Sequence, residues 1–472
     1  MSTPAMSASA TIAADDRGVR ADGRLAPGAL ITVAPTAPPR EASRLSRICD
    51  GIAFVFLLLA AGTLLFRPAD LLPSIRGAPI YELLMIACLV AGAPALLSNL
   101  SLRSFWRNGL LVLMLLMVPT IMLSHLWAGN TWEARIDGGE ALKAATLAVL
   151  VVTLVNTPLR MRMLMTAVVV SVVAVTVLAI LHYHAFLRVP ALASIEQRLP
   201  NSDSVVLRLC GIGVFNDPND FALLLVVAMC ICAYGLTESG GRVIRVAFLA
   251  PLLLFAYAFL LTHSRGGLIA LVGAALAFGV DRTGWRNTLF VALLVGAPVA
   301  ALASGRQFSV DLDDPNDTFQ TRLELWYEAM GVFWHAPILG VGPGRLVERF
   351  GAVAHNSYLQ AFTEMGFVGG TVFLGASAVA VRSVARARPI DPMASRMRPC
   401  MLAIAVGYGA GLLSLSRTYT VPTQLVLALA AAYLTFGRSM VPPLDLRLVR
   451  TLVLASVGMI AATQIFLRLM LH

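Results

Sequence analysis

Apolar stretches of about the length needed to cross a lipid bilayer recur along this chain from residue 52 to residue 470. In hydrocarbon every backbone N–H and C=O must be satisfied within the protein, so only helices and closed barrels span membranes. A helical span needs roughly 20 mostly apolar residues. Here 58% of the 472 residues are hydrophobic and 13% are charged. The sequence therefore predicts an all-α, polytopic transmembrane bundle of about 12–13 helices.

The expected spans follow one another without a heptad, a solenoid repeat or a glycine-serine linker between them. We therefore expect one transmembrane domain over residues 49–472. The spans are Ile52–Phe66, Ile80–Leu97, Gly109–Leu126, Ala141–Val155, Leu164–Ala185, Phe221–Leu236, Val246–Leu261, Leu268–Val280, Thr288–Ala303, Phe367–Val381, Met401–Leu415, Gln424–Phe436 and Thr451–Met470.

The first 48 residues contain no apolar run and are rich in Ala, Ser, Pro and Arg. Such a segment cannot bury a core, so we expect a disordered tail. The first apolar run is followed by Arg67-Pro68 and not by a small-residue cleavage site. We interpret it as a retained first span and not as a signal peptide.

Arginines alternate along the connections between spans and accumulate on the side of the N-terminal tail. The positive-inside rule makes that side cytoplasmic. The connections on this side carry Arg103, Arg107, Arg160, Arg162, Arg242, Arg245, Arg282, Arg286, Arg382–Arg398, Arg438, Arg447 and Arg450. The opposite side then receives the long, chemically varied loops, including a large loop at 305–365 that is expected to contain short helices and part of the site.

The net charge of +10 is distributed in this way along the membrane connections. It does not gather on one soluble face, so we expect no nucleic-acid partner. The six cysteines fall mostly in or beside apolar spans, and Cys230 and Cys232 lack the second pair that a zinc site needs. We interpret the cysteines as packing residues.

Two arginines on the outer side are candidates for binding an anion, and the first of them runs against the positive-inside trend. Arg265 lies in a tight turn between two spans, followed by two glycines at the start of a helix, which suits a phosphate or pyrophosphate. Arg322 begins an amphipathic segment expected to lie on the membrane surface and to point at the same anion. The alternatives are an Arg265 that reaches lipid headgroups and an Arg322 that is solvated.

His355 is the candidate catalytic residue, because an imidazole can take a proton from a hydroxyl near neutral pH. Asn356 and Tyr358 stand beside it and could orient the ring, and Glu364 follows two helical turns later. The alternative is a loop histidine that is hydrogen-bonded to water.

Further polar residues lie on the same side. Asn219 belongs to Phe215–Asp220, where Asn216 or Asp217 before Pro218 is typical of a helix N-cap. Arg345 and Arg417 are outer arginines that could contact a charged glycan. The acidic run Asp311–Asp317 lacks the glycine and the distant glutamate of a calcium loop, and His182 with His184 lacks a third ligand. We expect no metal site.

Five fragments in order resemble the O-antigen ligase family, which also contains polysaccharide repeat-unit polymerases. The resemblance covers roughly residues 208–415. The fragments are Phe215–Asp220, Ser264–Gly267, Arg322 with Trp326, Pro337–Gly344, and His355–Leu359 with Glu364 to Gly369.

The resemblance implies an enzyme of the bacterial inner membrane that needs no cofactor or metal ion. It would transfer a glycan from undecaprenyl pyrophosphate to an acceptor hydroxyl at the periplasmic face. Arg265 and Arg322 would bind the pyrophosphate and His355 would activate the acceptor. Arg345 competes with Arg322 for its role.

The acceptor stays open, because a ligase would use lipid A core and a polymerase a growing glycan. A transporter of the same lipid-linked oligosaccharide is the alternative from another class. A transporter is expected to place charged residues mid-span in broken helices. Arg265, Arg322 and His355 instead lie at one membrane face, which favours the enzyme.

Overall fold

The structure is a computed structural model that describes residues 44–100, 103–192, 194–198, 205–238, 241–289, 318–436 and 441–471. The chain divides into two compact units, Met1–Arg47 and Ile48–His472. Most of the expected tail 1–48 lies outside the described residues, and the fold below is that of the second unit.

Within the described ranges, ten helices are long and apolar enough to cross a membrane. The prediction of an all-α, polytopic fold is therefore confirmed. These helices are α1 (Arg44–Phe66), α3 (Ile80–Leu100), α5 (Gly109–Trp127), α7 (Pro158–Tyr183), α8 (Pro218–Thr237), α9 (Arg242–Thr262), α10 (Arg265–Thr283), α14 (Ser357–Arg386), α15 (Pro392–Gly411) and α17 (Leu446–Leu471).

Two further predicted spans are helical but fall outside that set. α6 (Thr131–Leu154) carries several charged residues in its first half, from Glu133 to Lys143, and α16 (Val421–Phe436) is shorter. Both pack inside the bundle, α16 against α6 and α15. The predicted span Thr288–Ala303 lies almost wholly outside the described residues.

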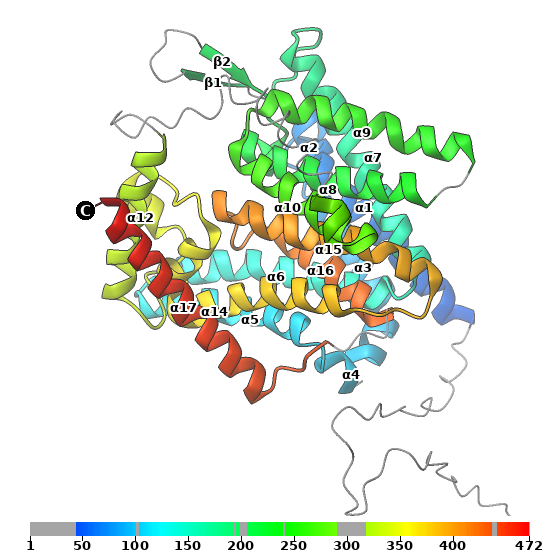
Figure 1. The fold of residues 1–472 in the computed structure, drawn as a ribbon. Coiled ribbons are helices and arrows are strands. Elements are labelled where there is room, and N and C mark those ends of the chain that lie inside the picture. The colour runs from blue at the N-terminus through cyan, green and yellow to red at the C-terminus, as the bar shows by residue number, and fades with distance from the viewer. Residues whose placement is uncertain are drawn as a thin grey trace, which may run out of the picture. The chain divides into compact units, whose positions relative to one another are not determined.

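Short elements connect the long helices. The β-hairpin was not predicted; its strands pair antiparallel, with Ile195 opposite Arg208. Figure 1 shows the hairpin and α12 at one end of the helices. The short elements are α2 (Pro68–Leu71), η1 (Pro73–Ile75), α4 (Arg103–Trp106), β1 (Ile195–Arg198), β2 (Val205–Arg208), η2 (Gly213–Phe215), α12 (Thr318–His335), α13 (Arg345–Phe350) and η3 (Leu412–Ser414).

Small residues allow the central helices to approach closely. α10 packs along α15, and a Cβ placed on Gly407 would lie 2.8 Å from the backbone oxygen of Ala270. Close backbone approach at small residues is the usual way in which membrane helices associate. This contact fixes the start of α10, and therefore Arg265, against the end of α15.

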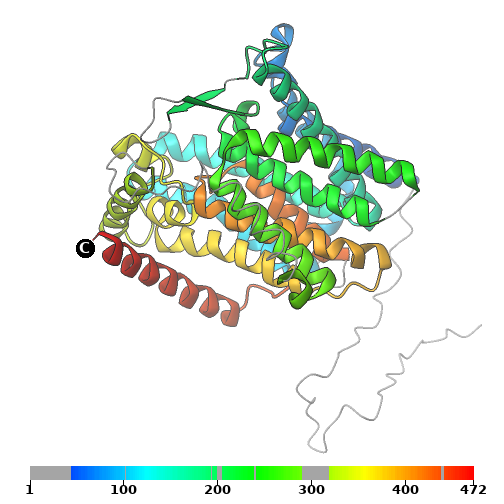
Figure 2. The ribbon, with the colours of Figure 1, turned by 45° about the horizontal axis from the view of Figure 1, so that its top comes forward.

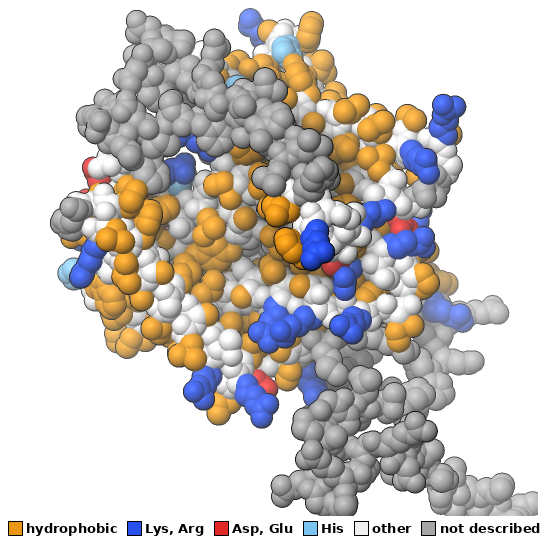
Figure 3. All heavy atoms as spheres, in the orientation of Figure 1, with side chains coloured by type: hydrophobic (Ala, Val, Ile, Leu, Met, Phe, Trp, Pro, Cys, Tyr) orange, Lys and Arg blue, Asp and Glu red, His pale blue; other side chains and the backbone are white. Residues whose placement is uncertain are grey.

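The outer faces of several helices remain apolar and exposed. Examples are Val90 of α3, Leu253 of α9 and Leu454 of α17, each at least 60% exposed. α17 lies beside α14 in both ribbon views (Figures 1 and 2). Figure 3 shows apolar side chains over much of this face, with Lys and Arg mainly toward its right and lower parts. An apolar exterior of this kind is expected for a protein surrounded by lipid.

The amphipathic segment that begins near Arg322 is a helix, as predicted, but its apolar face does not lie on a membrane surface. Leu323 and Met330 of α12 are 1% and 2% exposed and belong to a buried cluster with residues of α14 and α17. The expectation of an interfacial helix is corrected in this respect. α12 is instead attached firmly to the bundle.

α14 is kinked at Gly366, whose φ of 66° and ψ of −167° are not helical. The loop that follows α12 crosses the chain at this kink. The backbone N–H groups of Phe367 and Gly342 donate to the oxygens of Pro337 and Glu364, at 2.8 and 2.9 Å. A Cβ on Gly366 would overlap the carbonyl of Ile338, so the crossing requires glycine.

We predict that Gly366→Ala destabilises the protein strongly. Left-handed backbone costs an L-residue about 1–2 kcal/mol, and the overlap with Ile338 adds to that cost. Thermal unfolding in detergent should show a clear drop in Tm. Gly331→Ala is the matched control, because Gly331 lies in helical α12 with no atom within 4 Å of an added Cβ. A Tm for Gly366→Ala equal to that of the control would contradict the crossing.

Candidate functional site

The predicted site residues lie at the end of the bundle where α8, α10 and α14 begin and where α9 and α15 end. The end of β2, the start of α12 and the loop before α14 meet there. The charges of Arg265, Arg208 and Asp217 act on Arg322. The charges of Arg322 and Asp217 act on His355. The structure therefore brings these side chains close together.

Three guanidiniums form the centre of the site. Burial lowers the pKa of Arg322, and the charges of Arg265 and Arg208 lower it further. The pKa of Arg208 is lowered by burial and by Arg265, against the opposing charge of Asp217. Neither Arg265 nor Arg322 forms an ion pair with a described carboxylate. Positive charge is therefore concentrated without a matching number of acids.

Arg322 is also incompletely hydrogen-bonded. One of its terminal nitrogens donates weakly to Ser414 Oγ at 3.4 Å, and its Nε is buried without a partner in the described structure. An unsatisfied buried donor on a charged group is costly. An anion at this position would satisfy it.

Sequence reasoning missed Arg208. Its Nε donates to the backbone oxygen of Thr262 at 2.9 Å, and a terminal nitrogen donates to Asn219 Oδ1 at 3.1 Å. The signal was present, because Arg208 is an outer-side arginine like Arg265. Sequence analysis did not select this residue because the β-hairpin that positions it has no strong sequence pattern.

Asn219 joins the starts of two helices to the hairpin. Its Oδ1 accepts from Arg208 and, at 2.7 Å, from Ser264 Oγ. Ser264 in turn caps α10 by accepting from the N–H of Gly267 at 2.9 Å. Asp217 is the N-cap of α8, as one of the two predicted alternatives required. Asn219 thus positions arginines and does more than cap a helix.

The glycines after Arg265 allow α10 to approach η3. A Cβ on Gly266 would overlap the side chain of Ser414, which is the residue that Arg322 contacts. The Arg-Gly-Gly sequence therefore brings Arg265 close to Arg322. We note that both arginines lie on helices anchored in the bundle, so their separation is set by the fold.

His355 lies beside this positive charge. Its own backbone is left-handed, with a φ of 48°. Burial, together with the charges of Arg322 and Arg417 and against that of Asp217, lowers the pKa of the imidazole to about 4. The ring is therefore neutral at pH 7. Its backbone is held from both sides, by Trp326 Nε1 donating to Ala354 O at 2.6 Å and by the cap of α14 at Asn356.

Asn356 and Tyr358 do not hold the imidazole through the hydrogen bonds that the structure shows. Asn356 Oδ1 accepts from the N–H groups of Tyr358 and Leu359, both at 3.1 Å. The Tyr358 hydroxyl donates to Gly409 O at 3.0 Å. The expectation that these side chains orient the ring is thus corrected: they fix the start of α14, and only through it the position of His355.

Glu364 also serves the scaffold. The carboxylate is fully buried and accepts from Gln360 Nε2 at 2.9 Å and from the N–H of Leu346 at 3.3 Å. It therefore binds the start of α13 to α14. Arg345 on α13 pairs with Glu348 and is not one of the charges that shift the pKa of Arg322 or His355. The structure does not bring these two residues to the arginine cluster.

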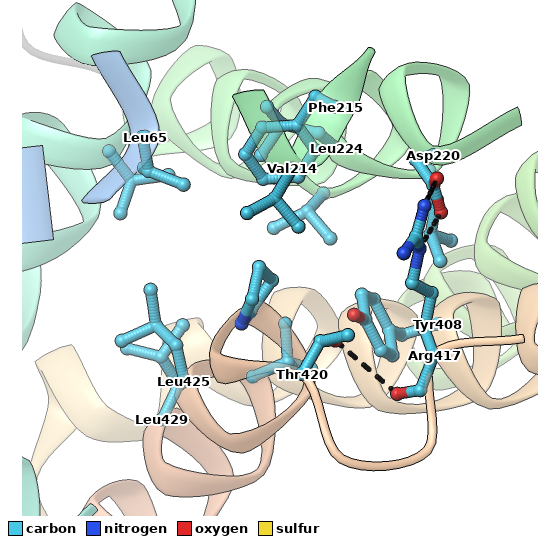
Figure 4. A pocket seen from close by; sticks show the side chains of 15 residues that line it. Leu65, Val214, Phe215, Asp220, Leu224, Tyr408, Arg417, Thr420, Leu425 and Leu429 are labelled. Carbon is cyan, nitrogen blue, oxygen red and sulfur yellow. Dashed lines mark hydrogen bonds and ion pairs between the residues drawn. The ribbon is translucent and has the colours of Figure 1, made fainter. Parts of the chain in front are cut away.

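Arg417 is paired with Asp220, a residue 5% exposed (Figure 4). Its Nε donates to Asp220 Oδ1 at 2.6 Å and a terminal nitrogen donates to Oδ2, so the pair is bidentate. The pair stands at the edge of a small cavity of about 30 Å³ lined by apolar residues such as Val214, Phe215 and Leu425. Arg417 therefore holds the loop after α15 to α8, and its charge is largely neutralised.

Among the described residues no three His, Cys, Asp or Glu side chains are grouped to hold a metal ion. His182 Nδ1 accepts from the N–H of Val189, while His184 Nε2 contacts the Tyr257 hydroxyl at 2.8 Å. The acidic run Asp311–Asp317 lies outside the described ranges.

The site combines a cluster of arginines and a neutral histidine at a polar end of a membrane-type bundle. Residues 250–374 match the O-antigen ligase family model. This match confirms the resemblance seen in the motifs and supports an O-antigen ligase- or polymerase-type function. Arg265, Arg322 and His355 lie inside the matched segment, whereas Arg208, Asn219 and Arg417 lie outside it. The search of curated proteins gave no match.

We predict that Arg417 matters for stability more than for ligand binding. Arg417→Ala leaves Asp220 buried and unpaired. Breaking a buried pair costs roughly 3–5 kcal/mol, and we expect the lower end because the Arg417 side chain is 29% exposed. Thermal unfolding in detergent should show a large drop in Tm. Arg265→Ala, which breaks no ion pair, should leave Tm within a few degrees. Equal effects of the two variants on Tm would refute this division.

Proposed function

We propose that the chain is a glycosyltransferase of O-antigen ligase type that transfers a glycan from undecaprenyl pyrophosphate to an acceptor hydroxyl. The observation that carries the proposal is the cluster of Arg208, Arg265 and Arg322 beside a neutral His355. The acceptor would be lipid A core in a ligase or a glycan chain in a polymerase, and the same donor site serves both.

The charge of the cluster suits a pyrophosphate. Guanidiniums bind phosphate oxygens in a bidentate way and remain charged even when partly buried. Asp217 is the acid that acts on this cluster, since Asp220 is engaged by Arg417. Arg265 and Arg322 form no ion pair with a carboxylate of the described residues, so these two side chains supply about two positive charges at pH 7. A pyrophosphate diester bears a matching negative charge.

The arginines would act most strongly as the donor bond breaks. In the transfer the acceptor oxygen forms a bond to the anomeric carbon of the donor sugar while the bond from that carbon to the pyrophosphate oxygen breaks. Undecaprenyl pyrophosphate leaves with the electron pair. Arg265 and Arg322 would stabilise the charge that develops on the leaving oxygen, and Arg208 would support them.

His355 would accept the proton of the acceptor hydroxyl. A pKa of about 4 in the free protein keeps the ring unprotonated but makes it a weak base. Binding of the anionic donor would offset the charges of Arg322 and Arg417 that depress this pKa. The donor would thus raise the basicity of His355 when the base is needed.

The same geometry favours catalysis over transport. Arg322 lies on α12, which is not among the helices that are long and apolar enough to cross a membrane, His355 precedes α14, and Arg265 is the first residue of α10. With the arginine-rich connections in the cytoplasm, this end would face the periplasm from the bacterial inner membrane. A water-soluble acceptor could then reach His355.

We predict that Arg322→Ala and Arg265→Ala each reduce transfer by roughly 10²–10³-fold, the usual cost of losing one transition-state donor. Lys should rescue poorly because it cannot bind in a bidentate way. The measurement is glycan transfer by reconstituted protein with a synthetic lipid-pyrophosphate donor. Arg349→Ala, an exposed arginine of α13, is the control and should leave transfer unchanged. Near-normal transfer by Arg322→Ala would show that this arginine does not stabilise the transition state.

We predict that His355→Ala lowers transfer by roughly 10²–10⁴-fold while donor binding survives. His335→Ala, at the exposed end of α12, is the control. In the wild type the base is active when neutral, so kcat/KM should fall as pH drops through about 4, the pKa in the free protein. The corresponding fall in kcat should come at higher pH, because bound donor raises the pKa.

The pH profiles also separate this role from a structural one. A fall in kcat at the same pH as the fall in kcat/KM would show that the donor does not change the basicity of His355. If the residual activity of His355→Ala falls at low pH in the same way as that of the wild type, another group is the base.

A further inference from the structure

A second and larger cavity lies at the opposite end of the helices from the arginine cluster. Its volume is about 810 Å³, within the range of small-molecule sites. It is lined where α6, α14 and α16 end, where α5 begins, and by the segment that precedes α17. These are the helix ends that carry the arginine-rich connections, so the cavity lies on the side expected to be cytoplasmic.

The cavity is lined by basic residues and by no described Asp or Glu. Arg107, Arg382 and Arg386 stand on its wall. None of the three forms a hydrogen bond or ion pair with the described part of the chain. Other arginines at this end do have partners: Arg160 pairs with Asp50 and Arg398 with Asp281. Acidic residues are therefore absent from the described wall of this cavity, although they occur elsewhere at this end of the bundle.

Three buried polar side chains on the wall of the cavity also lack partners in the described structure. They are Asn108 through its Nδ2, Thr153 through its Oγ1 and Ser383 through its Oγ. Their residues are 6%, 2% and 3% exposed. A buried donor without a partner is costly. Its presence at three positions around one basic cavity is best explained by a ligand that accepts hydrogen bonds.

We propose that this cavity binds a phosphate-bearing anion. A phosphate group offers several acceptor oxygens and negative charge to three guanidiniums, an amide and two hydroxyls. The site is independent of the proposed donor site because it shares no residue with it and lies at the other ends of the helices. The phosphate belongs either to the headgroup of an anionic lipid or to a soluble phosphate compound.

The binding site joins helices that are distant in sequence. Thr153 lies in the last turn of α6, and Ser383 lies near the end of α14, whose first residue, Ser357, follows His355 by two positions. Pro442, also on the wall, contacts the start of α5: a Cβ on Gly109 would overlap its carbonyl oxygen. A bound anion would therefore tie together the ends of α5, α6 and α14.

The test uses full-length protein with Arg208→Ala, Arg265→Ala and Arg322→Ala in every sample, so that anion binding at the proposed donor site does not contribute. The cavity variant adds Arg107→Gln, Arg382→Gln and Arg386→Gln. The matched control adds Arg242→Gln, Arg245→Gln and Arg282→Gln, exposed arginines at the same helix ends that do not line the cavity. The probes are inorganic pyrophosphate in detergent, and phosphatidylglycerol compared with phosphatidylcholine in nanodiscs.

We expect the cavity variant to lose at least tenfold in affinity for one of the two probes and the control to lose less than twofold. Binding of pyrophosphate would identify a soluble compound as the source of the phosphate. Retention of phosphatidylglycerol alone, seen by native mass spectrometry, would identify a lipid headgroup. Equal affinity of the two variants for both probes, or no binding of either probe, would overturn the proposal.

A smaller change guards against misfolding of the triple variant. Ser383→Ala removes one unpartnered hydroxyl and should weaken binding severalfold without lowering the Tm of the protein free of ligand. Unchanged binding, or a lower Tm without ligand, would show that this hydroxyl has no role in an anion site. Because the donor site is removed throughout, these outcomes do not depend on the proposed transferase activity.

Discussion

The mutual repulsion of Arg265 and Arg322, which have no carboxylate partner within the described ranges, is the constraint on which the polar end of this protein depends. Like charges near one another destabilise the folded state, so the scaffold must hold them by other interactions. Asn219 and Thr262 hold Arg208, and the packing of α10 on α15 holds Arg265. The apolar face of α12 anchors Arg322 in a buried cluster. The folded protein therefore carries an unfavourable electrostatic energy at this end, which a bound anion would reduce.

The sequence predicted the architecture well because hydropathy and arginine placement are local signals. Apolar length alone located the helices, apart from the region outside the described residues, and alternation of arginines placed the unusual polar groups at one end. Arg265 could be selected because it runs against the positive-inside trend, and Arg322 because it begins an amphipathic segment. The structure brings them together with His355, and their catalytic and binding roles remain proposals.

Pairings between distant segments could not be predicted. Asp220 and Arg417 are 197 positions apart, and nothing local shows that each has the other as its partner. Arg208 depends on a short hairpin with a weak pattern. Neighbours in sequence were also misleading: Asn356 and Tyr358 adjoin His355 but direct their hydrogen bonds to backbone groups of α14 and α15. Proximity along the chain does not show which way a side chain points.

The crossing of the loop after α12 with the kink in α14 has a consequence for the thermodynamics of folding. Ordering a free loop costs about 1–2 kcal/mol per residue in backbone entropy. Residues 337–342 are already ordered by hydrogen bonds to Glu364, Phe367 and Val368. The backbone entropy of this loop is therefore lost when the protein folds, and the loop needs no further ordering when the folded protein binds another molecule.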